Sequence, residues 1–188
     1  MKHPNFEMLK RVVRGEEVDV PVERRTVAIV VFYDAEGNVL LQDRKSISKA
    51  GEKWGLFGGG IENGETPVEG LKRELSEEVS GFPDGLNFKK LAEMRTVYYN
   101  ELKKNGYRDL YKHIFSCKIP IGTVINVIEG DGAKWFSYDE AKKQKMIHGN
   151  AEAIELAKVF ADGKDPDPKI FTQNGYRGGF FLKIKKCD

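Results

Sequence analysis

The sequence predicts an α+β fold in which a few helices pack on a mixed β-sheet. Two observations support this fold class. Strand-like runs of apolar and β-branched residues outnumber helix-like runs, and the two kinds do not alternate regularly along the chain, which favours a layered α+β arrangement. With 188 residues, the chain is long enough for one domain with additions at its ends, and a core of this size needs no disulfide support.

The composition argues against several classes of protein. The formal net charge is +2, whereas a broad nucleic-acid-binding surface needs a clustered basic excess. No apolar stretch approaches the ~18 residues that a membrane-spanning helix requires. Cys117 and Cys187 share no metal-ligand spacing, and the apolar run around Cys117 favours a buried thiol. Two cysteines without a secretory signal predict a reducing, cytoplasmic setting.

The first quarter of the chain contains a helix candidate and three strand candidates. Residues 6–13 fit a short helix, and residues 18–22 fit a short edge strand. Residues 26–32 are β-branched and apolar, which predicts a buried strand. Residues 34–38 have the composition of a turn, so residues 39–42 are expected to return as the second strand of a hairpin.

The strongest helix prediction covers residues 66–80. Thr66 is suited to the N-cap, Pro67 to the first helical position, and Glu69 completes a capping box with Thr66. Apolar residues recur at helical spacing and form a core stripe: Val68, Leu71, Leu75 and Val79. Gly81 and Pro83 then end the helix.

The second half of the chain contains further strand and helix candidates. The predicted strands are 89–99, 111–119 and 133–136, with a polar segment at 100–109, and the predicted helices are 137–145 and 150–161. A polar, proline-containing linker follows at 162–168. Beyond it, residues 170–172 and 180–184 look like two strands around Asn174-Gly175, a hairpin that packs on the domain or on a second subunit.

Three glutamates stand out on the helix at 66–80. Glu74, Glu77 and Glu78 are spaced i, i+3 and i+4, so their carboxylates share one face, separate from the core stripe. Like charges at this spacing repel, and a solvated acidic face is the simplest explanation for three glutamates on a helix. A hard divalent cation such as Mg²⁺ is the alternative, because it takes carboxylate oxygens and shares its remaining positions with water and substrate phosphates.

The sequence around these glutamates decides between the two explanations. Glycines at 58–60 permit close backbone approach, and Asn63-Gly64 forms a tight turn before Glu65. This segment resembles the signature of the Nudix hydrolase family: a glycine, five residues, a glutamate, seven residues, and then arginine-glutamate-apolar-any-glutamate-glutamate-any-glycine. Gly59 and Glu65 fill the first two positions, and residues 73–78 fill the core of the signature.

The sequence departs from the signature at its end. Ser80 stands where the closing glycine is expected, and Gly81 comes one residue late. This departure affects the helix end rather than the carboxylates, and it predicts a helix that is longer by about one residue.

The resemblance carries expectations about fold and activity. It implies a Nudix-type α/β/α sandwich with a mixed β-sheet over residues 26–161, between an N-terminal extension at 1–25 and a C-terminal extension at 162–188 that contains the possible hairpin. It also implies Mg²⁺-dependent hydrolysis of a phosphoanhydride bond in a nucleoside diphosphate linked to another moiety, with Mn²⁺ as a substitute. The expected partner is a small nucleotide rather than a nucleic acid or a membrane, and a homodimer is compatible with the sequence.

By the same resemblance, the metal set comprises Glu74, Glu77, Glu78, Gly59 and Glu129. Glu129 lies in a loop before Trp135, where MutT-like members carry a glutamate that completes the metal site or helps to deprotonate water. A solvated loop carboxylate is the alternative, and Asp131 could take its place.

Three further residues have two interpretations each. Arg73 is expected to hold Glu65, as the family's structural pair, or to pair with Glu69. Arg44 follows the second strand, where it either binds phosphate or is a solvated cation. Asn150 either reads a purine edge, as in MutT-like enzymes, or simply caps a helix.

Four aromatic residues remain. Trp54 and Phe57 are expected in the core rather than in stacking against a base. Tyr99 and its neighbour Tyr98 lie near where dinucleoside-polyphosphate-cleaving members carry a tyrosine, although strand aromatics are common.

The identity of the substrate stays open at this point. A modified nucleoside triphosphate, as in MutT, is one candidate, and a nucleotide sugar, ADP-ribose or a dinucleoside polyphosphate are others. Two different functions share the fold, namely isopentenyl-diphosphate isomerisation, which needs a differently placed cysteine than Cys117, and non-catalytic nucleotide binding, which usually accompanies loss of signature carboxylates. Residues 43–53, residues 100–109 and the C-terminal tail are expected to set specificity.

Overall fold

The computed structural model describes residues 6–48, 52–100, 106–163, 174–177 and 180–186. Its helices are α1 (Phe6–Arg14), α2 (Pro67–Glu78), α3 (Tyr138–Ala141) and α4 (Asn150–Ala161). Its strands are β1 (Val22–Tyr33), β2 (Val39–Asp43), β3 (Trp54–Gly55), β4 (Phe57–Gly60), β5 (Val79–Ser80), β6 (Lys89–Asn100), β7 (Gly106–Lys118), β8 (Asn126–Val127), β9 (Gly132–Phe136), β10 (Asn174–Arg177) and β11 (Phe180–Lys186).

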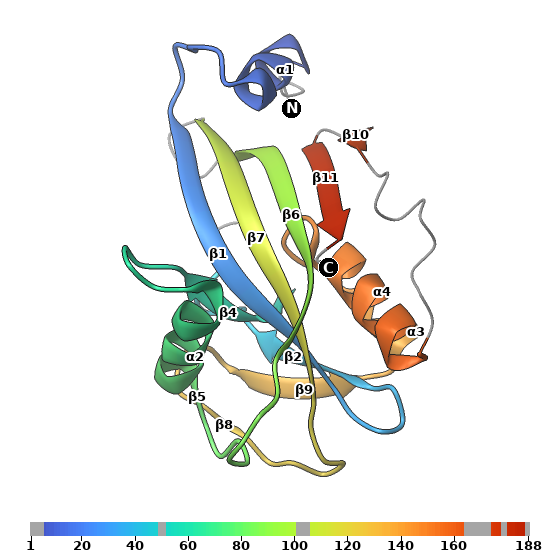
Figure 1. Ribbon diagram of the computed structural model, residues 1–188. Coiled ribbons are helices and arrows are strands. Elements are labelled where there is room, and N and C mark those ends of the chain that lie inside the picture. Colours follow the sequence, from blue (N-terminus) through green and yellow to red (C-terminus); the bar gives the residue numbers. More distant parts are fainter. Residues whose placement is uncertain (1–5, 49–51, 101–105, 164–173, 178–179, 187–188) are drawn as a thin grey trace.

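The main sheet is mixed. Within the described residues its strand order is β10-β11-β6-β7-β1-β2-β3, with β4 also paired to β1 and β9 to β2. β1 and β7 run parallel along their shared length, from Val22 opposite Tyr107 to Tyr33 opposite Lys118, whereas the other pairs of this sheet are antiparallel. Helices α2 and α4 lie on opposite faces of the sheet (Figure 1). The predicted α/β/α sandwich with a mixed sheet is therefore confirmed.

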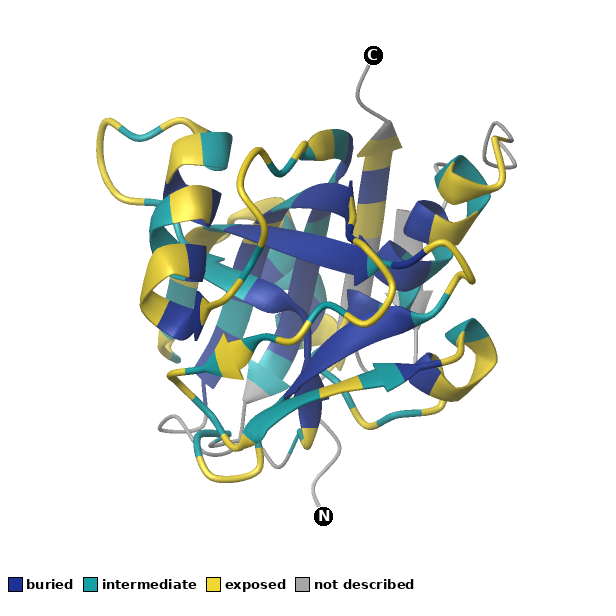
Figure 2. Ribbon diagram, turned by 90° about the horizontal axis from the view of Figure 1, so that it is seen from below, coloured by how far each residue is buried: buried dark blue, intermediate teal, exposed yellow. Residues whose placement is uncertain are grey.

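Two apolar layers hold the sandwich together. On one face, Leu71 and Leu75 of α2 share an apolar cluster with Phe57 of β4. On the other face, Ile154 of α4 and Trp54 of β3 belong to a second apolar cluster. Figure 2 shows the buried residues concentrated along the central strands and the facing sides of the helices. Each fully buried large apolar side chain stabilises the fold by roughly 1.5–3 kcal/mol. Trp54 and Phe57 are thus core residues, as predicted, and the Cys117 thiol is buried as well.

The N-terminal segment differs from its prediction in one element. The helix expected at 6–13 is present as α1, but residues 18–21 form no strand, and Val22 is the first residue of the central strand β1. Val18 and Val20 instead pack against the cluster that contains Leu9 of α1. Packing onto α1 has therefore taken the place of edge pairing.

Two elements in the second half differ in length. The helix expected at 137–145 is confined to α3, because the carbonyl of Lys145 accepts hydrogen bonds from the backbone N–H groups of Lys53 and Trp54, which draws the chain away from a helical path. β7 begins at Gly106, so Arg108 and Asp109 lie in a strand and not in the expected polar segment. The helix expected at 150–161 has the predicted bounds.

The C-terminal tail forms a hairpin from β10 and β11. The expected turn at Asn174-Gly175 is wrong, since both residues belong to β10 and face Lys183 and Leu182 of β11. β11 pairs antiparallel with β6, from Phe180 opposite Tyr98 to Lys186 opposite Ala92, so the hairpin continues the main sheet. The strand expected at 170–172 and residues 164–168 of the linker expected at 162–168 lie outside the described residues.

Within the described part of the chain, no helix is both long and apolar enough to cross a bilayer.

Candidate active site

The start of α2 follows the sequence prediction closely. Thr66 is the N-cap, its hydroxyl accepts a hydrogen bond from the backbone N–H of Glu69, and the Glu69 carboxylate accepts one in return from the backbone N–H of Thr66 at 2.8 Å. The capping box satisfies two backbone donors of the first turn. It therefore fixes where α2 begins and which face of the helix carries the signature glutamates.

The end of α2 differs from the prediction. The helix stops at Glu78, and Val79 is extended, with φ −146° and ψ 143°. Val79 and Ser80 form β5, which pairs with Val127 and Asn126 of β8. The expected lengthening of the helix is therefore wrong, because pairing with a distant strand takes these residues out of the helix.

This pairing brings the loop that follows β8 to the end of α2. The backbone N–H groups of Ile128 and Glu129 donate to the carbonyl oxygen of Glu78, at 2.7 and 3.4 Å. The Glu129 side chain is exposed, and its charge helps to raise the pKa of Glu78. Glu129 thus lies beside the signature glutamates, where the resemblance placed it.

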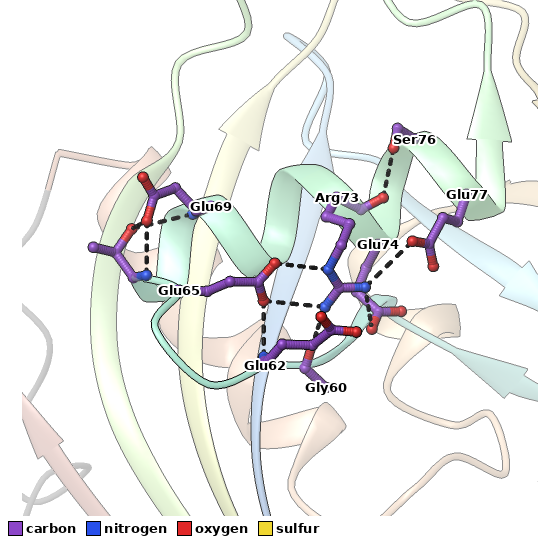
Figure 3. Close-up of polar contacts among 9 residues, drawn as sticks. Gly60, Glu62, Glu65, Glu69, Arg73, Glu74, Ser76 and Glu77 are labelled. Carbon is purple, nitrogen blue, oxygen red and sulfur yellow. Dashed lines mark hydrogen bonds and ion pairs between the residues drawn. The ribbon is translucent and has the colours of Figure 1, made fainter.

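Arg73 is the organising cation of the signature (Figure 3). Its Nε donates to Glu65 at 2.7 Å, and its Nη1 donates to Glu74 at 3.1 Å and to Glu77 at 3.4 Å. Its Nη2 donates to the Gly60 carbonyl at 2.7 Å. The planar guanidinium therefore fixes several oxygen atoms at once. Hydrogen bonding to Arg73 is the main reason that the pKa of Glu65 lies below its usual value.

The predicted Arg73–Glu65 pair is present, and the alternative of a pair with Glu69 is not, since the Glu69 carboxylate is engaged in the capping box.

The glycines of β4 allow the glutamates to approach the sheet. A side chain at Gly59 would place its Cβ 2.1 Å from an oxygen of Glu74, so any other residue there would displace the Glu74 carboxylate. Gly58 has φ +115°, and its backbone N–H donates to Glu78 Oε2 at 3.0 Å. The signature glycine at Gly59 therefore makes room for a carboxylate, and its neighbour Gly58 holds another.

The three glutamates have different surroundings. The Glu77 side chain is 58% exposed and that of Glu74 is 20% exposed, whereas Glu78 is only 5% exposed. Burial raises the pKa of Glu78 to about 7, with further increases from the charges of Glu74 and Glu129, and the Gly58 N–H and the nearby charge of Arg44 act in the opposite direction. A buried carboxylate beside other carboxylates is costly unless a cation compensates for it.

These residues fit a divalent cation by the chemistry of their oxygen atoms. Among the described residues, no three acidic, His or Cys side chains converge as a ready-made metal cage. Mg²⁺ does not need one, because it keeps several waters and takes substrate phosphates as ligands. The partly buried Glu74 and the buried Glu78 offer the kind of carboxylate pair that such an ion requires.

A chain of hydrogen bonds links Arg44 to the Glu129 loop. Arg44 Nη1 donates to Gln42 Oε1 at 2.9 Å, and Gln42 Nε2 donates to the Glu129 carbonyl at 2.7 Å. Asp131 accepts a hydrogen bond from the backbone N–H of Ser46 at 2.6 Å. Asp131 therefore has a role in anchoring this loop, while Glu129 lies beside Glu78.

A cavity of about 160 Å³ adjoins the glycines of β4. Arg44 and Asn150 both line it. Asn150 is buried, and it is the first residue of α4 rather than its cap, because Gly149 occupies the N-cap with φ +89°. The helix-cap interpretation of Asn150 is therefore wrong, and Asn150 lines the cavity together with Arg44.

Sequence reasoning missed three cationic residues that line this cavity: Arg25, Arg108 and Lys112. The spacing along the strand could have identified Lys112. Residues at every second position share one face of a strand, so Lys112 lies on the same face as the apolar Leu110 and Ile114. Tyr98 is also buried on the α4 side, with its ring centroid 4.9 Å from that of His148.

Residues 22–157 match the family model described as NUDIX domain. A search of curated proteins found no match. Similar solved structures include the dihydroneopterin triphosphate pyrophosphohydrolase of E. coli, which is 21% identical with a TM-score of 0.61 over 74% of this chain and 99% of that one. The MutT protein of Methanosarcina mazei Go1 is 17% identical with a TM-score of 0.57, over 79% of this chain and 100% of that one. An Ap4A hydrolase of C. elegans is 18% identical with a TM-score of 0.57, over 74% of this chain and 98% of that one.

At these identities the structural likeness shows the fold, and membership rests on the family model and on the signature residues. The family match spans well over half of the chain, and it includes α2 with its glutamates. The chain therefore belongs to the Nudix hydrolase family.

Proposed function

We propose that the protein hydrolyses a phosphoanhydride bond in a nucleoside diphosphate linked to another moiety, with Mg²⁺ held by Glu74, Glu77 and Glu78. One observation carries the proposal: Glu78, a buried carboxylate at the end of α2, lies near further carboxylates and is bound by the backbone of Gly58, which lines a cavity together with Arg44 and Asn150. Such a site can hold a metal ion on one side and the nucleotide on the other.

Each protein group has a separate task in this proposal. Bound Mg²⁺ would neutralise phosphate charge and lower the pKa of a water molecule, which supplies the nucleophile. Arg73 keeps Glu74 and Glu77 in position, and the Gly58 N–H does the same for Glu78.

Three residues beyond α2 complete the proposed site. The exposed Glu129 carboxylate, beside Glu78, is suited to act as a further metal ligand or to accept a proton from water. Arg44 binds phosphate oxygens, and Asn150 contacts the nucleotide base. Gly59 belongs to the site through the room that it leaves for Glu74.

The proposal also concerns the chemical group that is linked to the nucleoside diphosphate. A nucleoside triphosphate, modified or not, is the leading candidate, and a nucleotide sugar, ADP-ribose or a dinucleoside polyphosphate are the alternatives. Two of the similar structures are named for hydrolysis of dihydroneopterin triphosphate and of Ap4A, which illustrates how widely substrates vary on this fold. A non-catalytic binding module is the less favoured function, because every signature carboxylate is present.

A panel of these nucleotides, assayed for released phosphate, pyrophosphate and nucleotide by mass spectrometry, tests the proposal. We expect turnover of at least one class with Mg²⁺ or Mn²⁺ and loss of turnover in chelator. Calorimetry should show weak Mg²⁺ binding alone and stronger binding with nucleotide, because phosphate oxygens complete the ion's shell. No turnover across the panel, together with no metal binding in either condition, would contradict the proposal.

A further inference from the structure

The cavity beside β4 has an unusual charge composition. Four cationic side chains line it, those of Arg25, Arg44, Arg108 and Lys112, and none of the described residues that line it is acidic. The rest of its wall is largely apolar, with Leu56 and other side chains of the sheet. Because charges of one sign focus the potential in a concave, low-dielectric site, this cavity attracts anions.

Lys112 is the most buried of these cations. It is only 2% exposed, and its ammonium donates a hydrogen bond to the carbonyl of His148. An ammonium has three N–H donors, and in the described part of the chain no carboxylate lies within ion-pair distance of it. The charge of Glu152 acts on the ammonium without forming an ion pair with it. A buried cation without a directly bound counter-ion is costly, and an anion in the cavity would offset that cost.

The beginning of α4 adds to the positive potential. Gly149, the N-cap, provides no side-chain hydrogen bond to the first turn of this 12-residue helix. A Cβ at Gly149 would lie 3.2 Å from the Lys112 Nζ, so the ammonium lies against the helix N-terminus. The partial positive charge of a helix N-terminus repels a cation and attracts an anion, and both features therefore favour the same kind of ligand.

A further polar group lies close to the cavity. Burial raises the pKa of the Tyr98 hydroxyl, and a hydrogen bond with Arg108, at the facing strand position, acts in the opposite direction. Arg108 also pairs with Glu23 at 3.2 Å. Tyr98 and Glu23 thus hold Arg108 in place at the cavity wall.

We infer that this cavity binds a phosphate group of the substrate other than those held at the carboxylate helix, and that Lys112 is the residue that selects for it. The inference rests on the proposed function and narrows its substrate to nucleotides with an additional phosphate. That phosphate is either the third of a triphosphate chain or a phosphate on the sugar, and the two sources share the same chemistry.

Anion binding in chelator tests the site apart from catalysis. Without metal, the α2 glutamates repel anions, so pyrophosphate can bind only elsewhere. We expect calorimetry of the full-length protein to show pyrophosphate binding that is weakened at least about tenfold in Lys112→Met, as for the loss of a charge-assisted hydrogen bond. Lys118→Met is the matched control, since Lys118 is an exposed lysine of the same strand, and it should bind as the parent does.

A second variant distinguishes loss of the binding site from loss of the fold. Arg25 is exposed, so Arg25→Gln should leave the melting temperature unchanged and still weaken binding. Three outcomes would overturn the inference: no pyrophosphate binding by the parent in chelator, equal binding by the parent and both cavity variants, or binding of an uncharged nucleoside that is as tight as that of pyrophosphate. None of these outcomes depends on turnover, so failure of the proposed hydrolysis is a separate result.

Kinetics with Mg²⁺ identify the source of the phosphate. The parent should prefer a nucleoside triphosphate over the diphosphate, or a 3′-phosphorylated nucleotide over its unphosphorylated form, by at least about tenfold in kcat/KM. Lys112→Met should abolish whichever preference is found, and Lys118→Met should keep it. Absence of both preferences in an active parent enzyme would overturn the inference.

Discussion

Glu78 is the carboxylate of α2 whose environment differs most from water. It is buried, it lies near Glu74 and Glu129, and its pKa is raised to about 7. Its two neighbours on the helix face, the partly buried Glu74 and the exposed Glu77, keep more contact with solvent. If Glu78 holds the metal, its charge matters for the reaction and opposes folding whenever the metal is absent.

Glu78→Gln keeps the shape of the side chain and removes its charge. We expect kcat in excess Mg²⁺ to fall by about 10²–10⁴-fold, as for the loss of one electrostatic or acid–base group. In chelator, the melting temperature should be unchanged or raised, because a buried, self-repelling charge is gone. Glu36→Gln, the same change in the turn after β1, should alter neither quantity. Unchanged turnover in a folded Glu78→Gln enzyme would falsify the metal-binding role.

The buried Lys112 is expected to make the stability of the protein depend on pH. Burial lowers its pKa from 10.5 to about 8, opposed by the charge of Glu152. Between these two values the unfolded chain holds the proton and the folded chain has released it, so stability rises with pH through this window. Below about pH 8 both states are protonated, and the full cost of the buried charge is present.

Lys112→Met should therefore raise the melting temperature at pH 7 and raise it less at pH 10. Calorimetry in phosphate-free buffer measures the difference in melting temperature between the variant and the parent. This difference should shrink steadily as the pH increases from 7 to 10. Lys118→Met should show no such trend. A difference that is independent of pH would mean that the lysine keeps its proton in the folded protein.

At the scale of elements, a mostly buried ion pair adds to the apolar packing that attaches α1 to the sheet. Arg95 of β6 donates to both oxygens of Asp109 on β7, each at 2.8 Å, and its remaining Nη donates to the carbonyl of Val13 at 3.0 Å. The pair thus joins two strands and the last turn of α1. Arg24 also approaches Asp109, at 3.7 Å, but it is 57% exposed.

Asp109→Asn should lower the free energy of unfolding by about 1.5–3 kcal/mol, because hydrogen bonds to a charged group in a mostly buried pair are lost. Arg24→Gln removes only the exposed partner and should cost less than about 0.5 kcal/mol. Urea denaturation of the two variants and the parent gives the comparison. If both variants lose the same stability, the Arg95 contact is not what holds this end of the molecule.

At the scale of the whole molecule, the tail hairpin covers the edge of the long strand β6 and leaves the four-residue strand β10 at the end of the sheet. β11 pairs with β6 over its length, and Ile184 of β11 is 2% exposed within the core layer under α4. Uncovered strand edges promote pairing between chains. The tail therefore shields an edge that would otherwise be open to a second copy of the chain.

Ile184→Asp should release the hairpin, because a charge cannot be buried in the apolar layer. We expect faster proteolysis of the tail and larger species in light scattering after size-exclusion chromatography. Lys183→Asp is the matched control, since Lys183 is the exposed neighbour on the same strand, and it should behave as the parent does. Monomeric, protease-resistant Ile184→Asp protein would show that the sheet edge does not need this cover.

The sequence by itself determined the parts that depend on short separations along the chain. The Thr66–Glu69 capping box, the bounds of α4 and the shared face of Glu74, Glu77 and Glu78 follow from helical spacing. The Arg73–Glu65 pair spans only eight residues. In each of these cases the residues involved are close in sequence, so their types and spacing are sufficient to place them.

The tertiary structure alone decided what depends on distant contacts. Gln42 reaches Glu129 across 87 residues and Lys112 reaches His148 across 36, and no local pattern encodes either contact. The same reason explains the end of α2, where pairing of β5 with β8 overrides helical propensity. It also explains the cationic cavity, whose cations come from β1, from β7 and from the segment after β2. Local spacing therefore identified the carboxylates and the chemistry that they suit, and long-range packing determined what surrounds them.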